Sequence, residues 1–299
     1  MKLSIITINY NNASGLRKTL ASVASQTYRD IEHIIVDGGS TDGSVEVIRE
    51  YDNTIKQSVT IDQSTIQVKW LSEPDNGIYN AMNKGIRKAT GDYIQILNSG
   101  DLLAAPDVTE RMMAALEAQN DEMSRTDVLN EPLSLNDEVA IFYGNMIKKD
   151  YTTGKIIGKS REVEYSLRQY FNSTMNHDCC YIRRDIYEKY GLYDENLKIV
   201  SDWKWFLQVI GLGNVKPVYV DIDVTIFDAS GISETNLTLR NQERRQVLEE
   251  LLPPAILADY DKYAFQTTQI DRLKKYHLWG LVYFMERVLF KLNKWGILR

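Results

Sequence analysis

Val36-Asp37-Gly38-Gly39-Ser40-Thr41-Asp42-Gly43-Ser44 is the stretch of this 299-residue sequence that decides the fold. A short β-rich run, residues 32–36, leads into it, and a run with helical spacing, residues 44–51, follows it. The small residues between the two runs let the backbone turn tightly after a strand. A strand, a tight turn and a helix in this order are typical of a sheet that is covered by helices.

The same alternation continues on both sides of this stretch. It predicts strands at residues 3–8, 68–71 and 92–97 and helices at residues 14–26 and 77–89. The fold class is therefore α/β, with a mostly parallel central sheet flanked by helices. Because ligands bind beyond the carboxyl ends of the strands in such sheets, we expect Asn9, Asp37 and Asp101, each just past a strand, to converge on one crevice.

The remaining segments are less regular. Residues 52–67 and 117–138 are predicted to be surface loops, the second because it is rich in polar residues. Shorter strands and a strong helix at residues 201–210 complete the domain. Beyond residue 237 the pattern is helical to the end of the chain.

Charge is unevenly distributed along the chain. The formal net charge is −6, which argues against a nucleic-acid binder that relies on a general basic surface. Residues 272–299 carry seven basic residues and one acid, Glu286, a net +6, so the rest of the chain carries −12. A basic end on an acidic body suggests a partner for that end.

The cysteines and the N-terminus indicate a cytoplasmic protein. Cys179 and Cys180 are the only cysteines, and adjacent residues have poor geometry for a disulfide, so we expect two small buried side chains on a strand. The first twelve residues contain too short an apolar run for a signal peptide. No uncharged stretch approaches the ~20 residues needed to span a bilayer.

Five segments taken together carry a family resemblance. They are Thr7-Ile8-Asn9-Tyr10-Asn11, the stretch quoted above, Leu97-Asn98-Ser99-Gly100-Asp101, Gly191-Leu192-Tyr193-Asp194-Glu195 and Ser201-Asp202-Trp203. In order and spacing, over roughly residues 2–231, they resemble the family 2 glycosyltransferases with the GT-A fold. The resemblance implies an inverting transferase, a nucleotide-sugar donor and usually a divalent metal ion, Mn²⁺ or Mg²⁺. We accordingly divide the chain into a GT-A domain, residues 1–236, and a C-terminal helical extension, residues 237–299.

Donor-binding residues are expected at the strand ends and in the polar entry to the helix at residues 77–89. Asp37 can accept hydrogen bonds from a uracil edge or a ribose, whereas Asp42 is better suited to capping the next helix. Asp75 also fits a helix cap, Lys84 an ordinary solvated position, and Asn9 and Tyr10 a plain strand-end turn. The candidates for donor binding are Thr7, Asn9, Tyr10, Asp37, Asp75, Asn83, Lys84, Asn98, Ser99 and His177.

The expected metal motif departs from the family pattern. Family members commonly carry Asp-x-Asp-Asp where this chain has Asn98-Ser99-Gly100-Asp101. One carboxylate together with the donor's diphosphate is still chemically sufficient for a hard divalent ion. Asp101 is therefore the expected metal ligand, with Asn98 as a weaker oxygen donor, and metal dependence itself is left open by the sequence.

Asp202 is the expected catalytic base. The family places a base at the second residue of an acidic pair, which maps onto Asp202, while Ser201 departs from the first. A base takes the proton from the acceptor hydroxyl as it attacks the anomeric carbon. We expect partial burial beside aromatic residues to raise the pKa of Asp202. Its alternative role is a carboxylate at a helix N-terminus. For His177, which lies where the family has acceptor or metal contacts, the alternative is a structural hydrogen-bonded histidine.

The tail supports two interpretations. Its apolar residues fall at helical spacing with Lys and Arg between them, which suits a helix in a membrane interface. The alternative is a helix that packs on the body of the protein or in a homodimer. Peripheral contact with the inner face of the cytoplasmic membrane would favour a lipid-linked acceptor.

The sequence therefore predicts a glycosyltransferase that moves a sugar from a nucleoside-diphosphate sugar, most commonly a UDP-sugar in this family, to a glycan or lipid-linked acceptor in polysaccharide biosynthesis of the cell envelope. The alternative is a catalytically silent nucleotide-sugar-binding module, because acids of the family are missing at Gly100 and Ser201. A nucleotidyltransferase would need basic residues near the first turn, where this sequence has Asn9, Asn11 and Asn12 instead. A dinucleotide-dependent oxidoreductase is disfavoured because the glycines follow the second strand and lack the required spacing.

Overall fold

The computed structural model describes residues 1–58, 66–126, 139–150, 153–163, 167, 170, 174–228 and 236–294. The chain forms two compact units, Met1–Glu243 and Arg244–Arg299, and each is described by itself. The first unit extends past residue 236, where the sequence suggested a boundary. That earlier boundary stays a prediction.

The first half of the sheet is parallel and buried. Its strands are β1 (Leu3–Asn9), β2 (Ile31–Asp37), β3 (Gln67–Ser72) and β4 (Tyr93–Ile96), in the order β3-β2-β1-β4. All three neighbouring pairs are parallel, and β1 and β2 are buried along their whole length. Near-continuous apolar strands are what a parallel sheet covered on both faces requires. The predicted α/β fold is thus confirmed for these strands.

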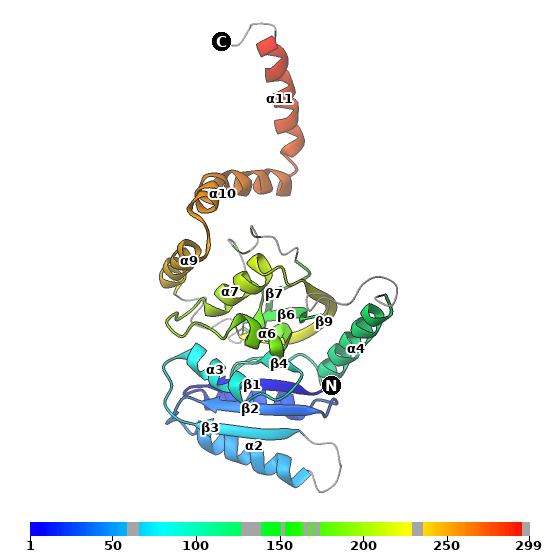
Figure 1. Ribbon diagram of the computed structural model, residues 1–299, viewed down its shortest axis with the longest axis vertical. Coiled ribbons are helices and arrows are strands. Elements are labelled where there is room, and N and C mark those ends of the chain that lie inside the picture. The colour runs from blue at the N-terminus through cyan, green and yellow to red at the C-terminus, as the bar shows by residue number, and fades with distance from the viewer. Residues whose placement is uncertain are drawn as a thin grey trace. The chain divides into compact units, whose positions relative to one another are not determined.

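Three helices connect these strands and cover them. They are α1 (Ala13–Ala24), α2 (Ser44–Ser58) and α3 (Ile78–Lys88). Figure 1 shows α2 running beside β3, the edge strand of the sheet. Ile5 of β1 packs in one core with α1 and α2, whereas its neighbour Ile6 points to α3, where a Cβ on Gly85 would lie 2.3 Å from Ile6 Cγ2. The alternation of side chains along β1 therefore builds two helical layers, one on each face of the sheet.

The second half of the sheet is mixed. It continues from β4 through β8 (Cys180–Arg183), β6 (Ile141–Lys149), β9 (Pro217–Asp228) and β5 (Leu102–Leu103), and β7 (Ile156–Lys159) pairs with β6. Strand β6 runs parallel to β9, while β8 is antiparallel to both β4 and β6. The very short β5 pairs with the far end of β9. This last pairing brings residues after β4 next to residues more than a hundred positions later.

The two segments predicted as loops are mainly helical where the structure describes them, apart from residue 66 and Gln67, with which β3 begins. Helix α2 continues to Ser58, and α4 (Val108–Thr126) covers the start of the second segment. The prediction was wrong because polar residues were taken as a sign of irregular structure. In α2 the buried Tyr51 and Ile55 keep the helical spacing, and residues 117–122 of α4 are exposed or half-buried, as polar residues on the outer face of a helix are. Residues 59–65 and 127–138 lie outside the described part of the chain.

The remaining helices follow the sheet. They are the single turn of 3₁₀ helix η2 (His177–Cys179), α6 (Arg184–Tyr190), α7 (Ser201–Phe206) with its π-helical continuation η3 (Leu207–Leu212), and then α9 (Leu237–Leu251), α10 (Pro254–Lys275) and α11 (Trp279–Lys294). Cys179 and Cys180 are both buried free thiols, as expected. Among the described residues no helix has the length and apolar character to cross a membrane.

Candidate active site

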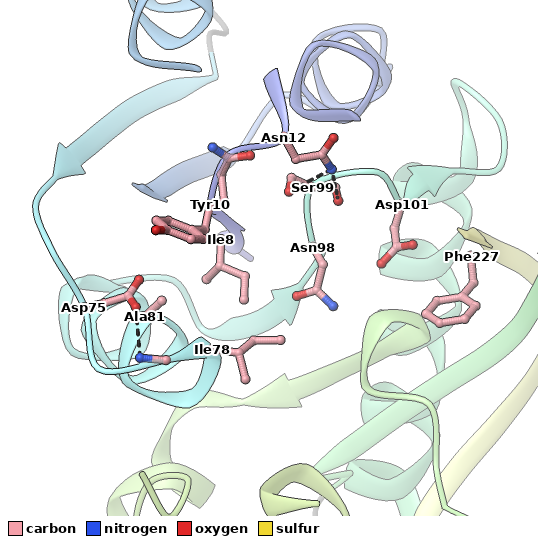
Figure 2. A pocket seen from close by; sticks show the side chains of 12 residues that line it. Ile8, Tyr10, Asn12, Asp75, Ile78, Ala81, Asn98, Ser99, Asp101 and Phe227 are labelled. Carbon is pink, nitrogen blue, oxygen red and sulfur yellow. Dashed lines mark hydrogen bonds between the residues drawn. The ribbon is translucent and has the colours of Figure 1, made fainter. Parts of the chain in front are cut away.

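A pocket of about 420 Å³ opens at the carboxyl ends of β1 and β4. It is lined by Ile8, Asn9, Tyr10, Asn12, Asp75, Gly77, Ile78, Ala81, Asn98, Ser99, Asp101 and Phe227. Figure 2 shows Tyr10 and Asp75 at one end of the pocket and Asp101 and Phe227 at the other, with Asn98 between. Two of the three residues expected to converge, Asn9 and Asp101, line this pocket, and the third, Asp37, does not.

Asp37 lies just behind the pocket wall and holds the strand ends together. Its Oδ1 accepts hydrogen bonds from Asn9 Nδ2 at 2.8 Å and Ser40 Oγ at 2.6 Å, and its Oδ2 accepts from Ser72 Oγ at 2.6 Å and Ser40 N at 2.9 Å. Burial by itself would raise the pKa of Asp37, but the bonds from Ser40 and Ser72 outweigh it and hold the pKa below its ordinary value. With both oxygens engaged and no exposed surface, Asp37 joins β1, β2 and β3 and does not line the pocket.

The end of the pocket near Tyr10 is shaped by a glycine. The ring of Tyr10 is 66% exposed, and Asp75 Oδ1 accepts a hydrogen bond from Gly77 N at 2.9 Å in the turn before α3. A Cβ placed on Gly38 would lie 2.4 Å from Asp75 Oδ2 and 3.2 Å from Tyr10 Cδ2. Asp75 can therefore lie beside Tyr10 only because residue 38 has no side chain. Asp42 instead accepts from Ser44 N at 3.1 Å and from Ala13 N at 2.8 Å, in agreement with its capping alternative.

Three predicted donor-binding residues lie away from the pocket. The amide of Asn83 is buried and donates to Tyr193 O and Glu195 Oε1, each at 2.8 Å. Lys84 Nζ donates to Pro74 O at 3.1 Å, and the Thr7 hydroxyl is buried 3.0 Å from His33 Nε2. These side chains hold α3, the loop before it and the β1–β2 interface. The partners of Asn83 and Thr7 are distant in the sequence, which is why the local pattern did not reveal them.

The turn after β4 presents oxygen atoms to the pocket. Gly100 has a φ of +110°, and the Thr19 hydroxyl accepts from Gly100 N at 2.9 Å and lies 2.8 Å from Asp101 O. Asn12 Nδ2 donates to Ser99 O at 3.0 Å. The turn is thereby held so that Asp101, only 4% exposed, points into the pocket (Figure 2).

A divalent cation fits these atoms only if it shares ligands with a substrate. Asn98 Oδ1 is buried and has no hydrogen-bond partner among the described residues. The same part of the chain contains no group of three or more His, Cys, Asp or Glu side chains placed to hold a metal ion. One carboxylate, Asp101, and one amide oxygen, Asn98 Oδ1, are oxygen donors of the type that Mg²⁺ or Mn²⁺ uses together with phosphates and water.

A chain of polar contacts leads from the pocket wall to Asp202. His177 Nε2 lies 3.2 Å from Asn98 Nδ2, and His177 Nδ1 lies 3.3 Å from Asp202 Oδ2. The Tyr79 hydroxyl donates to Asp202 Oδ1 at 2.9 Å. The side chains of His177 and Asp202 are 17% and 16% exposed, and neither residue lines the pocket itself. They form the layer directly behind Asn98.

The pKa of Asp202 is lowered, and the rise expected from burial is therefore corrected. Burial does favour the neutral acid, but hydrogen bonds from His177 and Tyr79 outweigh it. Burial likewise opposes the charge on His177, yet Asp202 raises its pKa above the ordinary value, with help from Asp178 and Asp101. Asp202 is thus held as a carboxylate next to His177, whose pKa it raises.

Several residues around the pocket were not predicted. Asn12 caps α1 by accepting from Gly15 N at 3.1 Å, and its place in an Asn-rich turn before a helix was a usable signal. Phe227 reaches the pocket through the β5–β9 pairing, in which Leu102 lies opposite Ile226. No local sequence pattern predicts that pairing. Tyr79 looked like an ordinary residue in the first turn of a predicted helix.

Comparison with known proteins gives the family. The family model described as glycosyl transferase family 2 matches residues 4–191. An uncharacterised glycosyltransferase of Mycobacterium tuberculosis is 28% identical over 236 residues, which cover 77% of this chain and 76% of the relative. A PGL/p-HBAD biosynthesis glycosyltransferase of Mycobacterium bovis is 26% identical over 233 residues, covering 78% and 79%.

Solved structures share the fold at low sequence identity. A mannosyltransferase from Pyrobaculum calidifontis, in complex with GDP-Man and Mn²⁺, matches with a TM-score of 0.58 and 17% identity over 83% of this chain and 63% of that one. Residues 1–349 of S. aureus TarS, in complex with UDP-GlcNAc, match with a TM-score of 0.57 and 17% identity over 83% and 64%. The matches span less than two thirds of those two chains.

The family model extends from β1 to the residue after α6, more than half of the chain, and includes every strand end that borders the pocket except that of β9. The sheet and helices have the GT-A arrangement of the solved neighbours. The chain therefore belongs to glycosyl transferase family 2 and is a glycosyltransferase with the GT-A fold.

Proposed function

We propose that the pocket binds a nucleoside-diphosphate sugar and that the enzyme transfers the sugar, with inversion, to a hydroxyl of a glycan or lipid-linked acceptor in polysaccharide biosynthesis of the cell envelope. The observation that carries this proposal is the arrangement of the pocket, with Tyr10 and Asp75 at one end and Asp101 at the other. An elongated donor with a base at one end and a diphosphate further along matches that order. Two solved neighbours are in complex with UDP-GlcNAc and with GDP-Man, which supports this class of donor. Of the possible donors we favour a UDP-sugar.

At the first end, the side chains suit a base and a ribose. The exposed ring of Tyr10 offers an apolar face to a flat base. The carboxylate of Asp75 can accept hydrogen bonds from N–H groups of a base or from ribose hydroxyls. Asn9 adds a buried Oδ1 that has no partner among the described residues, so this wall also has an acceptor to offer.

At the second end, we propose that Asp101 and Asn98 Oδ1 hold a divalent cation, Mn²⁺ or Mg²⁺, together with the donor's phosphates. When bound, such an ion offsets the negative charge that develops on the departing diphosphate. The donor set of one carboxylate and one amide is weak by itself, so we expect the ion to bind mainly with the nucleotide.

Asp202 is the proposed base. It would take the proton from the acceptor hydroxyl while that oxygen attacks the anomeric carbon opposite the diphosphate. Tyr79 and His177 fix its two oxygens and keep the pKa of Asp202 low enough for the carboxylate to be available at neutral pH. Burial and the neighbouring Asp202 raise the pKa of Tyr79 well above its ordinary value, so its hydroxyl remains a hydrogen-bond donor.

A catalytically silent nucleotide-sugar-binding module is the second candidate. The observation that favours it is the absence of carboxylates at Gly100 and Ser201, where the family carries acids. Such a module would bind the donor without consuming it. An enzyme also hydrolyses its donor slowly in the absence of acceptor, so release of free nucleotide separates the two candidates.

Helix α11 suits the surface of a membrane that contains anionic lipids. Its apolar side chains are exposed, among them Leu281 at 58%, Phe284 at 64% and Met285 at 54%. Arg287, Lys291 and Lys294 follow one another at helical spacing along the border of this apolar side, since Lys291 is seven residues after Phe284. An exposed apolar side flanked by basic residues is the composition of a helix that lies in a bilayer interface. We therefore propose a peripheral position on the inner face of the cytoplasmic membrane, which would suit a lipid-linked acceptor.

Vesicle sedimentation tests the membrane proposal. The full chain should bind vesicles with phosphatidylglycerol far better than vesicles of phosphatidylcholine alone, and Lys291→Glu combined with Lys294→Glu should weaken that binding about tenfold or more. Equal binding to both vesicles, or none, contradicts it. A homodimer that forms in solution through Leu281 and Met285 would assign this apolar side to a second copy of the chain instead.

Calorimetric titration with UDP, GDP and dTDP, with and without Mn²⁺, tests the donor site. We expect one nucleotide to bind in a metal-dependent way, and Asp101→Ala to abolish the metal dependence. If no nucleotide binds under any condition, the proposed donor site is wrong. If the nucleotide binds equally well without Mn²⁺ and to Asp101→Ala, the proposed cation is wrong, but the pocket remains the proposed donor site.

A further inference from the structure

Glu243 of α9 is a buried carboxylate that binds three consecutive backbone amides. Its Oε1 accepts from Lys198 N at 2.7 Å, and its Oε2 accepts from Ile199 N at 2.9 Å and Val200 N at 3.3 Å. The residue is 6% exposed. A carboxylate that accepts several backbone N–H bonds forms short, charge-assisted contacts that fix the position of the peptide. Glu243 therefore determines where residues 198–200 lie.

This segment leads directly into the proposed base. Val200 is the N-cap residue of α7, and no side chain within the segment caps the helix. The exposed N–H groups at a helix start need acceptors, and a negative charge is favourable there. Glu243, from another helix, accepts from one of these groups, Val200 N, and places its negative charge just before the helix start. Asp202 lies in the first turn of α7, two residues after the last amide that Glu243 binds.

The opposite side of the segment is held by Tyr79. Its hydroxyl lies 2.6 Å from Ile199 O and 2.9 Å from Asp202 Oδ1. Tyr79 belongs to α3, and the residues just before it, Gly77 and Ile78, line the pocket. The backbone of residue 199 is thus fixed on its N–H side by Glu243 and on its C=O side by Tyr79. The same tyrosine also touches the base, so a shift of the segment changes the geometry at Asp202.

We propose that Glu243 is a positioning residue for catalysis: by anchoring residues 198–200 it holds Asp202 in register with Tyr79 and His177, and it sets kcat without contacting the substrate. This inference rests on the proposed role of Asp202 as the base. Glu243 lies beyond residue 191, where the family match ends, and beyond the boundary expected at residue 236. The functional transferase domain therefore includes the start of α9.

The first test follows backbone amides and needs no substrate. Glu243→Gln keeps the size of the side chain but replaces one acceptor oxygen by an NH₂ group, which cannot accept from the amide it faces. We expect hydrogen exchange of the amides of residues 198–203 to accelerate about tenfold or more, while strands β1 and β2 keep their protection. Glu249→Gln is the matched control, because Glu249 lies on the same helix and is exposed in an ion pair with Arg245. Unchanged exchange in Glu243→Gln overturns the proposal.

The second test uses turnover, measured as nucleotide release from UDP-GlcNAc and from GDP-mannose by the full chain. Glu243→Gln should lower kcat tenfold or more and leave the nucleotide Kd within about twofold. In an Asp202→Asn background the same change should cause no further loss, because both substitutions act on one group. An equal further loss, or a loss that follows nucleotide affinity, overturns the proposal. Glu249→Gln should match the wild type.

A shorter carboxylate guards against a variant that fails to fold. Glu243→Asp keeps the charge but reaches less far, so kcat should fall between those of the wild type and Glu243→Gln. A wild-type level of kcat in Glu243→Asp with accelerated amide exchange would separate the segment from catalysis and overturn the proposal. If the wild type releases nucleotide but Asp202→Asn does so equally fast, the proposed base is wrong. That comparison uses only the wild type and Asp202→Asn, so it tests the base separately from the role of Glu243.

Discussion

His177 Nδ1 lies 3.3 Å from Asp202 Oδ2, and this contact shifts the pKa of each side chain against the direction that burial alone would give. Without it, burial would favour the neutral form of each group. With it, the pKa of Asp202 falls below its ordinary value and that of His177 rises above it. A carboxylate ready to accept a proton is therefore kept behind the pocket by a partner 25 positions earlier in the chain.

Asp202→Asn should remove the base and leave the donor site intact. We expect kcat to fall about 10²–10⁴-fold, the usual contribution of a positioned general base. The nucleotide Kd, measured by calorimetry, should change less than about threefold, because Asp202 does not line the pocket. A variant with normal kcat would assign the base to another residue.

His177→Ala should move the acid limb of the pH–rate profile. Asp202 must be ionised to act, and its lowered pKa lets the wild type keep its kcat as the pH falls below the ordinary Asp value. Once His177 is removed, burial is no longer offset by its strongest partner, so the pKa of Asp202 rises and kcat is lost at a higher pH. The measurement is kcat from pH 4 to pH 8. An acid limb that stays in place would show that Tyr79 alone keeps Asp202 ionised.

Gly38→Ala should displace Asp75 and weaken nucleotide binding about tenfold or more. The new Cβ would lie 2.4 Å from Asp75 Oδ2, the end of a side chain, so the carboxylate and not the backbone gives way. We expect the melting temperature to change little and the Kd to rise. Gly158→Ala is the matched control, since its Cβ would meet only Lys148 Cβ at 3.8 Å. Normal affinity in Gly38→Ala would mean that Asp75 does not contact the donor.

His33 should make the protein sensitive to acid. It is fully buried between Thr7 and Tyr51, and burial lowers the pKa of His33 from 6.5 to about 3. Between these values the unfolded chain binds a proton that the folded chain does not, so stability is complete above pH 6.5 and falls as the pH drops toward 3. The slope for one proton is about 1.4 kcal/mol per pH unit.

Urea unfolding at pH 8, 6 and 5 measures this slope. His33→Gln should lower stability at pH 8 by about 1–3 kcal/mol, because it breaks buried hydrogen bonds. It should also flatten the pH dependence below 6.5. Thr7→Val should affect stability alone and leave the nucleotide Kd unchanged, since Thr7 does not reach the pocket. An unchanged slope in His33→Gln would assign the acid sensitivity to other groups.

The features that local sequence determines were predicted well. The strands follow from short β-rich runs, and Asn9 at the end of β1 and Asp101 in the turn after β4 line the pocket because parallel strands end at one edge. Tyr10 was found in the same way, and Asp75 from the polar entry to the next helix. Strand periodicity and turn chemistry act over a few residues, so a single sequence contains the information.

The features that depend on distant partners were not predictable. Asn83 looked like a donor contact, but its amide is engaged by Tyr193, which is 110 positions away. Asp202 was expected to have a raised pKa, since the hydrogen bonds from Tyr79 and His177 that reverse the effect of burial were not visible. Glu243 carries no motif at all. Its role follows only from the three amides that the fold brings to it.

The pairing of β5 with β9 has a consequence for the growing chain. Leu102 pairs with Ile226, so the wall that Phe227 gives the pocket is made from residues synthesised long after the turn that contains Asp101. Long-range pairing of this kind delays folding until both partners are present. A nascent chain should therefore shape the end of the pocket near Tyr10 first and complete the end near Asp101 only after β9 has left the ribosome. The enzyme would thus acquire its donor site in two stages.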